Sequence, residues 1–111
     1  MKAAVYHGPR DIRVEEVPTP AIADDEVLVR VVACGISGAD LHLYRLGMFE
    51  ALGRPVEGGR VMGHELAGEI AAVGASVTDF KPGDRIAGLS FGRAGLGGGF
   101  TGRGRRLAGL G

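Results

Sequence analysis

The stretch "VMGHELAGEIAAVGASVTDFKPGDRIAG", residues 61–88, decides the fold because it holds two strand patterns joined by a turn signal. In "ELAGEIAAVG", apolar and polar positions alternate, which puts Leu66 and Ile70 on the face opposite Glu69. "FKPGD" then supplies a proline–glycine turn into a further strand, "RIAGL". This part of the chain therefore predicts short strands joined by tight connections.

The residues before this stretch continue the strand pattern. In "AAVYH" and "DIRVEEV", apolar residues alternate with polar ones over runs too brief for a helix. Ile12 and Val14 point one way while their charged neighbours point the other. "VPTPA" ends the pairing, because proline donates no hydrogen bond to a neighbouring strand. "EVLVRVVACGI", residues 26–36, is the most apolar run, so we expect it to be the most buried strand.

One short helix is predicted in "SGADLHLYRL", residues 37–46, where Leu41, Tyr44 and Leu46 fall near helical spacing. Ser37 followed by Asp40 resembles a capping box at its start. The next segment, "GMFEALGRPVEGGR" at residues 47–60, is glycine-rich and aperiodic. It predicts a loop long enough to serve as a working surface.

The last residues, 90–111, differ in composition from the rest. Nine of the final twenty are glycine, and they offer little apolar surface to offset the entropy of ordering. "GGGFTG" in this tail matches a dinucleotide-binding pattern, but no strand leads directly into it, so we assign no cofactor site there. We therefore expect a folded part over residues 1–89 and a flexible, disordered Gly/Arg-rich tail over residues 90–111.

Charge and cysteine usage exclude several classes of protein. Acidic and basic residues number 13 each in the 111-residue chain, although residues 1–89 alone have a net charge of −4, since all four tail charges are arginines. This balance predicts no nucleic-acid partner and no binding to an anionic membrane. No apolar run approaches the ~18 residues that would span a bilayer. A single cysteine forms no internal disulfide, so we expect a reducing, cytoplasmic setting.

Two polar clusters are the candidate metal and catalytic residues. Cys34 ends the most apolar strand, so we expect a buried, inert thiol, and a Cys₄ zinc site is ruled out. In "GHE", His64 and Glu65 place an imidazole and a carboxylate just before a strand. Asp40 and His42 strengthen this candidate because ligating histidines commonly donate their second nitrogen to a carboxylate. Helix capping by Asp40 and an exposed helical His42 remain the simpler alternatives.

Three segments together resemble the N-terminal catalytic domain of zinc-dependent medium-chain alcohol dehydrogenases, in the branch of the sorbitol, threonine and 2,3-butanediol dehydrogenases. They are "MKAAVYHGPRDIRVEEVPTP", "EVLVRVVACGISGADLH" and "VMGHELAGEIAAVGASVTDFKPGDRIAG". The resemblance covers about residues 1–91. It implies a mainly β fold, a partly open GroES-like β-barrel with one short helix.

The resemblance also implies roles for individual residues. His64 matches the histidine ligand of the catalytic zinc, Glu65 the glutamate beside the metal, Asp40 the carboxylate that supports the ligating histidine, and His42 the proton-relay histidine. Ser37 stands where the family's A-C-G-I-C-G-S/T-D-x-H pattern has its ligating second cysteine. The implied metal residues are therefore His64, Glu65 and Ser37, and the implied catalytic residues are His42, Asp40 and Glu65.

Two departures from the family pattern weaken the implied chemistry. Zinc in such sites acts as a Lewis acid while hydride moves to the nicotinamide, and the neutral hydroxyl of Ser37 does not replace the charge of a thiolate. We therefore expect zinc to bind weakly. Ala39 falls where the relay hydroxyl should be, so a path to His42 would need a bridging water.

The family continues into a four-cysteine lobe and a Rossmann domain that binds NAD(P), and these 111 residues contain neither. We therefore expect the chain to be inactive as a fragment. It is expected to self-associate through the face that the Rossmann domain covers in the family. In a full-length relative, the substrate would be a small alcohol or polyol and the cofactor NAD(P).

Three alternatives stay open. The chain could be a non-catalytic remnant of a truncated or frameshifted gene. It could be related to zinc-independent quinone or enone reductases, which Ser37 and Ala39 would suit and the retained "GHE" speaks against. It could also be a co-chaperonin-like barrel, although no apolar tripeptide for docking to a chaperonin ring is evident.

Overall fold

The structure, a computed structural model, describes residues 1–47 and 59–89 and the backbone of residues 100–101. Contacts divide the chain into two compact units. The first unit comprises Met1–Thr19 and Ile36–Gly63, and the second comprises Pro20–Gly35 and His64–Gly111. The expected loop at residues 47–60 lies mostly outside the described residues, as does most of the expected flexible tail at residues 90–111.

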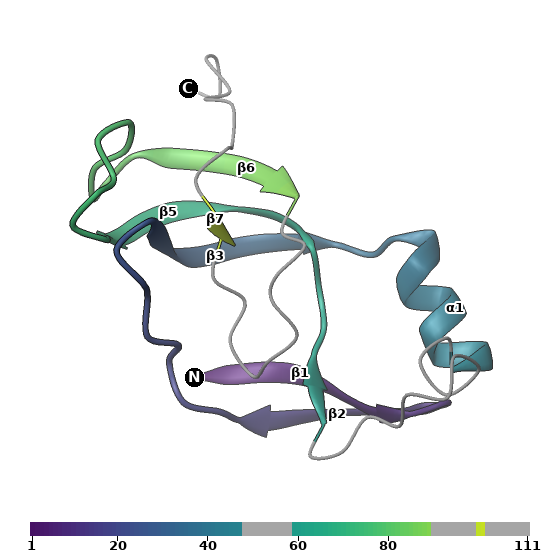
Figure 1. Ribbon diagram of the computed structural model, residues 1–111. Coiled ribbons are helices and arrows are strands. Elements are labelled where there is room, and N and C mark those ends of the chain that lie inside the picture. Colours follow the sequence, from purple (N-terminus) through teal and green to yellow (C-terminus); the bar gives the residue numbers. More distant parts are fainter. Residues whose placement is uncertain (48–58, 90–99, 102–111) are drawn as a thin grey trace. The chain divides into compact units, whose positions relative to one another are not determined.

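The first unit contains a three-stranded antiparallel sheet and the helix (Figure 1). Its elements are β1 (Lys2–Gly8), β2 (Asp11–Glu16), α1 (Gly38–Leu46) and β4 (Arg60–Val61), and the strand order is β2-β1-β4. Val5 and Tyr6 of β1 and Leu43 of α1 are its buried apolar side chains among the described residues. The central strand of this sheet therefore supplies most of the unit's core.

The turn between β1 and β2 is connected to the end of α1. Arg10 adopts a left-handed backbone conformation with φ of 62°, uncommon for a residue other than glycine. In this conformation the Arg10 backbone N–H donates a 2.7 Å hydrogen bond to the Tyr44 carbonyl. That carbonyl belongs to the last turn of α1, where carbonyls lack partners within the helix. The hairpin turn thus anchors one end of α1.

Helix α1 begins and ends with recognisable caps. Ser37 is its N-cap, and Ser37 and Asp40 form the capping box that the sequence predicts. Gly47 ends the helix in the left-handed region, with its backbone N–H bonded to the Leu43 carbonyl at 3.1 Å. Both the position of the helix and its capping are confirmed.

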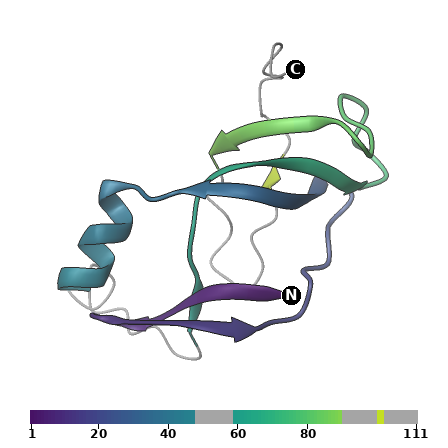
Figure 2. The same cartoon turned by 180° about the vertical axis from the view of Figure 1, so that it is seen from behind.

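The second unit contains a four-stranded antiparallel sheet, seen from opposite sides in Figures 1 and 2. Its strands are β3 (Glu26–Gly35), β5 (Glu65–Val73), β6 (Arg85–Leu89) and β7 (Phe100–Thr101), in the order β6-β5-β3-β7. The predicted strands at "ELAGEIAAVG" and "RIAGL" are confirmed. Val27, Ile70, Phe80 and Ile86 form the core cluster of this unit.

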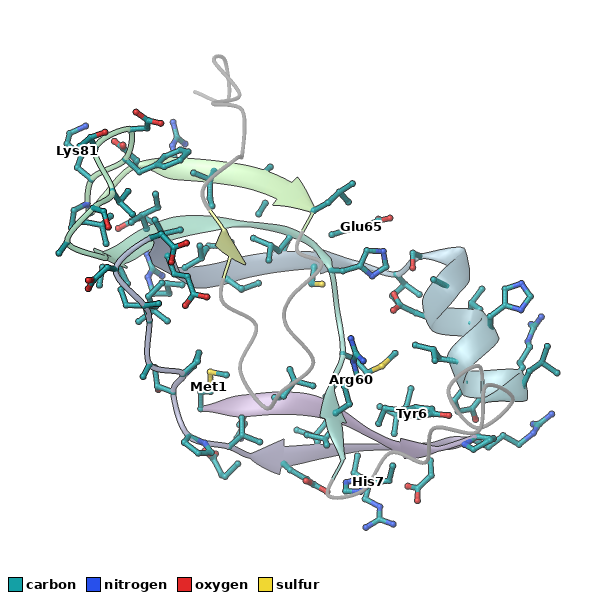
Figure 3. All side chains as sticks on the ribbon, viewed as in Figure 1. Met1, Tyr6, His7, Arg60, Glu65 and Lys81 are labelled. Atoms are coloured by element: carbon teal, nitrogen blue, oxygen red, sulfur yellow. The ribbon has the colours of Figure 1, made fainter. Side chains whose placement is uncertain are left out.

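The proline–glycine turn before β6 is held by one carboxylate. Asp84 accepts hydrogen bonds from the Lys81 backbone N–H at 3.1 Å and from its ammonium group at 2.7 Å, and Lys81 is labelled at this turn in Figure 3. Gly83 has a φ of 92°, which glycine adopts without strain. The proline–glycine turn that the sequence predicts at "FKPGD" is therefore confirmed.

Two expectations about β3 are wrong. Its first half packs into the core through Val27, but residues 30–35 are all exposed, so it is not the most buried strand. Cys34 belongs to this exposed half and is not the buried thiol we expected. The physical reason is that β3 is long, and the core cluster covers only the end that contains Val27. Apolar composition did not distinguish the two ends.

Candidate functional site

Glu65 is placed by strand pairing at the start of β5, where Figure 3 labels it. Its partner in β3 is Gly35, and a Cβ added to Gly35 would lie 2.9 Å from the Glu65 carboxylate oxygen Oε2. An alanine at position 35 would therefore require the Glu65 carboxylate, the end of a flexible side chain, to shift. Gly35 thus allows the Glu65 carboxylate to lie close to the β3 backbone.

His64 precedes Glu65 and forms a pair with it. The turn into this position passes through Gly63, which has a φ of 102°. The His64 Nε2 atom lies 3.9 Å from Glu65 Oε1, and their side chains are 23% and 44% exposed. An imidazole and a carboxylate are therefore adjacent and accessible at the entrance to β5.

Cys34 lies on the other side of the same sheet. Residues paired across two antiparallel strands share a face, and consecutive residues alternate between faces. Cys34 is paired with Leu66 and Gly35 with Glu65, so the thiol faces away from the Glu65 carboxylate. The only thiol in the chain is therefore not arranged to join Glu65 at a metal.

Ser37, Asp40 and His42 belong to the first unit, where Ser37 is the N-cap of α1, Asp40 lies in its first turn and His42 at its centre. The Asp40 backbone N–H donates to Ser37 Oγ at 3.3 Å, and the Ser37 backbone N–H donates to Asp40 Oδ2 at 2.9 Å. Both residues are half-buried, whereas His42 and Ala39 are exposed. The structure thus joins Ser37 to Asp40 in one unit and His64 to Glu65 in the other.

The described donors supply only part of a zinc site. Two donor atoms about 2 Å from one tetrahedral zinc ion lie roughly 3.4 Å apart, so a small rotation of exposed Glu65 would bring it and His64 to this spacing. Among residues 1–47 and 59–89, however, no group of three or more His, Cys, Asp or Glu side chains could hold a metal. The remaining expected donor is the hydroxyl of Ser37. This donor set does not fit a closed, four-coordinate zinc centre.

A second polar cluster, which the sequence analysis missed, lies on the β1–β2 hairpin. His7 Nε2 is 2.6 Å from Glu15 Oε1, and Arg13 binds the Asp11 carboxylate through two hydrogen bonds of 2.8 Å. The hydrogen bond from Arg13 lowers the pKa of Asp11. The signal in the sequence was that the charged residues of "DIRVEEV" at odd positions share one face of a strand. Which residues they contact depends on the register between β1 and β2, which the sequence pattern does not give. Figure 3 labels His7 on this strand.

Within the described part of the chain, the one helix is too short to cross a membrane.

Comparison with known proteins identifies the family. Residues 23–105 match the family described as the alcohol dehydrogenase GroES-like domain. The sorbitol dehydrogenase of Bacillus subtilis (strain 168) is 53% identical over 90 residues, which cover 78% of this chain and 24% of that protein. The chain thus spans about a quarter of the length of this relative.

Solved structures agree with the sequence relatives. An alcohol dehydrogenase from Thermus sp. ATN1 matches with a TM-score of 0.66 and 39% identity, covering 78% of this chain and 24% of that one. The 2R,3R-butanediol dehydrogenase from Bacillus subtilis matches with a TM-score of 0.68 and 33% identity, covering 80% of this chain and 27% of that one. The expected mainly β, GroES-like fold is confirmed, and the chain belongs to the family of the alcohol dehydrogenase GroES-like domain.

Proposed function

We propose that this chain is the substrate-side domain of a zinc-type alcohol or polyol dehydrogenase that uses NAD(P). The observation that supports the proposal most directly is the His64–Glu65 pair at the entrance to β5, beside Gly35, in a chain of this family. The relatives named above act on alcohols by their names, and a small alcohol or polyol is the substrate class we propose here.

The reaction removes two hydrogens from the substrate. The hydroxyl proton passes to a base, the hydride on the carbinol carbon passes to the oxidised nicotinamide, and a carbonyl compound and NAD(P)H are formed. We propose that His42 accepts the proton, through a water because Ala39 offers no hydroxyl. Asp40 would have the role it has in the family, which is to support the ligating histidine. His64 and Glu65 would face the substrate oxygen.

Zinc is the family's metal, and we propose that this chain holds it weakly. His64 and Glu65 are the ordinary donors, whereas Ser37, at the position of the family's ligating cysteine, has no charge to offer Zn²⁺. When bound, zinc would supply Lewis-acid polarisation of the substrate oxygen.

NAD(P) would be bound outside this domain in a full-length relative, so we propose that these 111 residues alone do not catalyse hydride transfer. We also propose a cytoplasmic setting for the protein. The exposed half of β3, residues 30–35, includes Val31 and Val32 at 51% and 72% exposure. Such apolar side chains favour self-association of the isolated chain.

The experiment that tests the proposal compares zinc content in matched variants. Ser37→Cys restores the family's thiolate, so it should take up about one zinc per chain after dialysis against Zn²⁺, whereas the unaltered chain retains much less. His64→Ala in the Ser37→Cys background is the control and should abolish the gain. Equal zinc content in the unaltered chain and the Ser37→Cys variant would contradict the proposed zinc site, in which position 37 limits the affinity.

A second test addresses the activity. Ser37→Cys placed in a protein that joins this domain to a nicotinamide-binding domain of the family should oxidise polyols with NAD(P), and the serine form should be much slower. A non-catalytic remnant would show no polyol oxidation in either form. A zinc-independent reductase would instead reduce quinones or enones with NAD(P)H and would be indifferent to zinc chelators.

A further inference from the structure

Ser37 occupies the position of the family's ligating cysteine, yet its side chain already has a structural partner. Its backbone is extended, with φ of −95° and ψ of 167°, as is typical of an N-cap residue. Its Oγ accepts the Asp40 backbone N–H at 3.3 Å. The first hydrogen bond within the helix is from the Leu41 N–H to the Ser37 carbonyl at 3.3 Å. The serine side chain therefore serves as an acceptor for the Asp40 N–H at the start of the helix.

Asp40 returns the interaction. Its Oδ2 accepts the Ser37 backbone N–H at 2.9 Å, which completes the reciprocal box. It is also the acidic residue of the first turn, where a negative charge is favourable beside the positive end of the helix dipole. Both side chains are half-buried, so solvent replaces these hydrogen bonds only in part.

We propose that Ser37 acts in this chain as the N-cap of α1 and not as a metal ligand, so that the start of the helix is fixed without a metal. The inference deepens the proposed function, on which it rests for the identity of position 37 as the family's ligand position. A cysteine there would have the opposite properties. Its thiolate binds zinc well, but its sulfur is a weak acceptor for the Asp40 N–H.

Serine at position 37 therefore caps the helix but binds zinc poorly, and cysteine would do the reverse. Capping and metal binding can be distinguished by whether the stability of the fold depends on zinc. A capping residue stabilises the fold equally in the presence and absence of a chelator. A metal ligand stabilises it only when the metal is bound, by an amount that rises with the metal concentration.

The test uses the full 111-residue chain with Ser37, Ser37→Asn, Ser37→Ala and Ser37→Cys, each unfolded by urea in EDTA and in excess Zn²⁺. Asparagine caps helices as well as serine does, but its amide is not an ordinary zinc ligand. In EDTA, the folded-to-unfolded ratio should be similar for serine and asparagine and roughly fivefold lower for alanine and cysteine. In Zn²⁺, only the cysteine variant should gain stability and bound zinc.

Two outcomes would overturn the capping role. One is that alanine is as stable as serine in EDTA. The other is that the advantage of serine over asparagine and alanine emerges only with Zn²⁺, which would make Ser37 a ligand. If alanine fails to fold, the serine–asparagine comparison still decides between the roles.

A further outcome separates this inference from the proposed function. In that outcome, Ser37→Cys binds no zinc, while the unaltered chain and Ser37→Asn are equally stable in EDTA. The capping role of Ser37 would then be supported, and the proposed zinc site of a dehydrogenase would be contradicted.

Discussion

Gly47 ends α1 with φ of 65° and ψ of 70°, a conformation that costs an L-residue with a Cβ roughly 1–2 kcal/mol. We therefore expect Gly47→Ala to lower the free energy of unfolding by about 1 kcal/mol in urea titrations. Gly38→Ala is the matched control at the other end of the helix, where an added Cβ meets nothing within 4 Å. An equal loss in the Gly38 variant would contradict the role of the left-handed conformation.

Asp11 gives the clearest pH dependence at the residue scale. Its pKa is lowered chiefly by the hydrogen bond from Arg13. Desolvation opposes this shift, and the charges of Arg13 and His7 add smaller decreases. Because the folded pKa lies below the unfolded value of about 3.9, the stabilisation is present above that pH and is lost as the pH falls through the folded pKa. The pair is exposed, so its contribution is small.

Arg13→Gln should therefore raise the pKa of Asp11 toward its ordinary value and flatten the acid limb of the stability curve. Carboxyl NMR titration measures the pKa directly. Arg30→Gln removes a comparable exposed ion pair, with Glu69 in the other unit, and should leave the Asp11 titration unchanged. An unchanged Asp11 pKa in Arg13→Gln would show that the hydrogen bond is not the cause.

Residues whose roles are local were predicted better than residues whose roles depend on distant packing. The capping of α1 by Ser37 and Asp40 was predictable because capping involves residues three apart in sequence. The exposure of Cys34 was not, since it depends on which other elements cover β3. The His7–Glu15 pair likewise depends on the pairing of two strands.

At the scale of elements, Gly68 shows what the second sheet requires. An added Cβ at Gly68 would lie 2.3 Å from the Arg30 carbonyl oxygen, a backbone atom that cannot move without disturbing the β3–β5 pairing. We expect Gly68→Ala to lower the free energy of unfolding by about 1–3 kcal/mol in urea. Ala71→Ser, at an exposed position of the same strand, should change it by less than about 0.5 kcal/mol. If Gly68→Ala left the free energy of unfolding unchanged, β3 and β5 would not be as close at this position as the structure shows.

Alternation and turn chemistry predicted β5, β6 and the turn between them because both signals lie within the segments themselves. β7 was missed, since two residues, Phe100 and Thr101, are too few to show a period inside a glycine-rich stretch. Their pairing with Glu26 and Val27 is set by the partner strand. The strand order β6-β5-β3-β7 is likewise a property of the whole sheet, which no single segment encodes.

At the scale of the whole molecule, the GroES-like fold followed from the resemblance and not from alternation, which predicts strands but not their arrangement. The ordered motifs around Ser37 and His64 carried that identification, and the family match confirms it. The candidate site was predicted as a set of residues. Their division between two units was not predictable, because it depends on how segments far apart in the sequence pack together.

The exposed half of β3 leads to a prediction for the isolated chain. Val32 is 72% exposed and Val14, on β2 of the other unit, is 77% exposed, so the two valines are matched in exposure but differ in location. If self-association uses β3, Val32→Thr should shift sedimentation velocity toward the monomer at a given concentration, and Val14→Thr should not. Threonine keeps the β-branched shape that strands favour, so both variants should fold. A monomeric unaltered chain at all concentrations would contradict self-association, and equal effects of both variants would place it elsewhere than on β3.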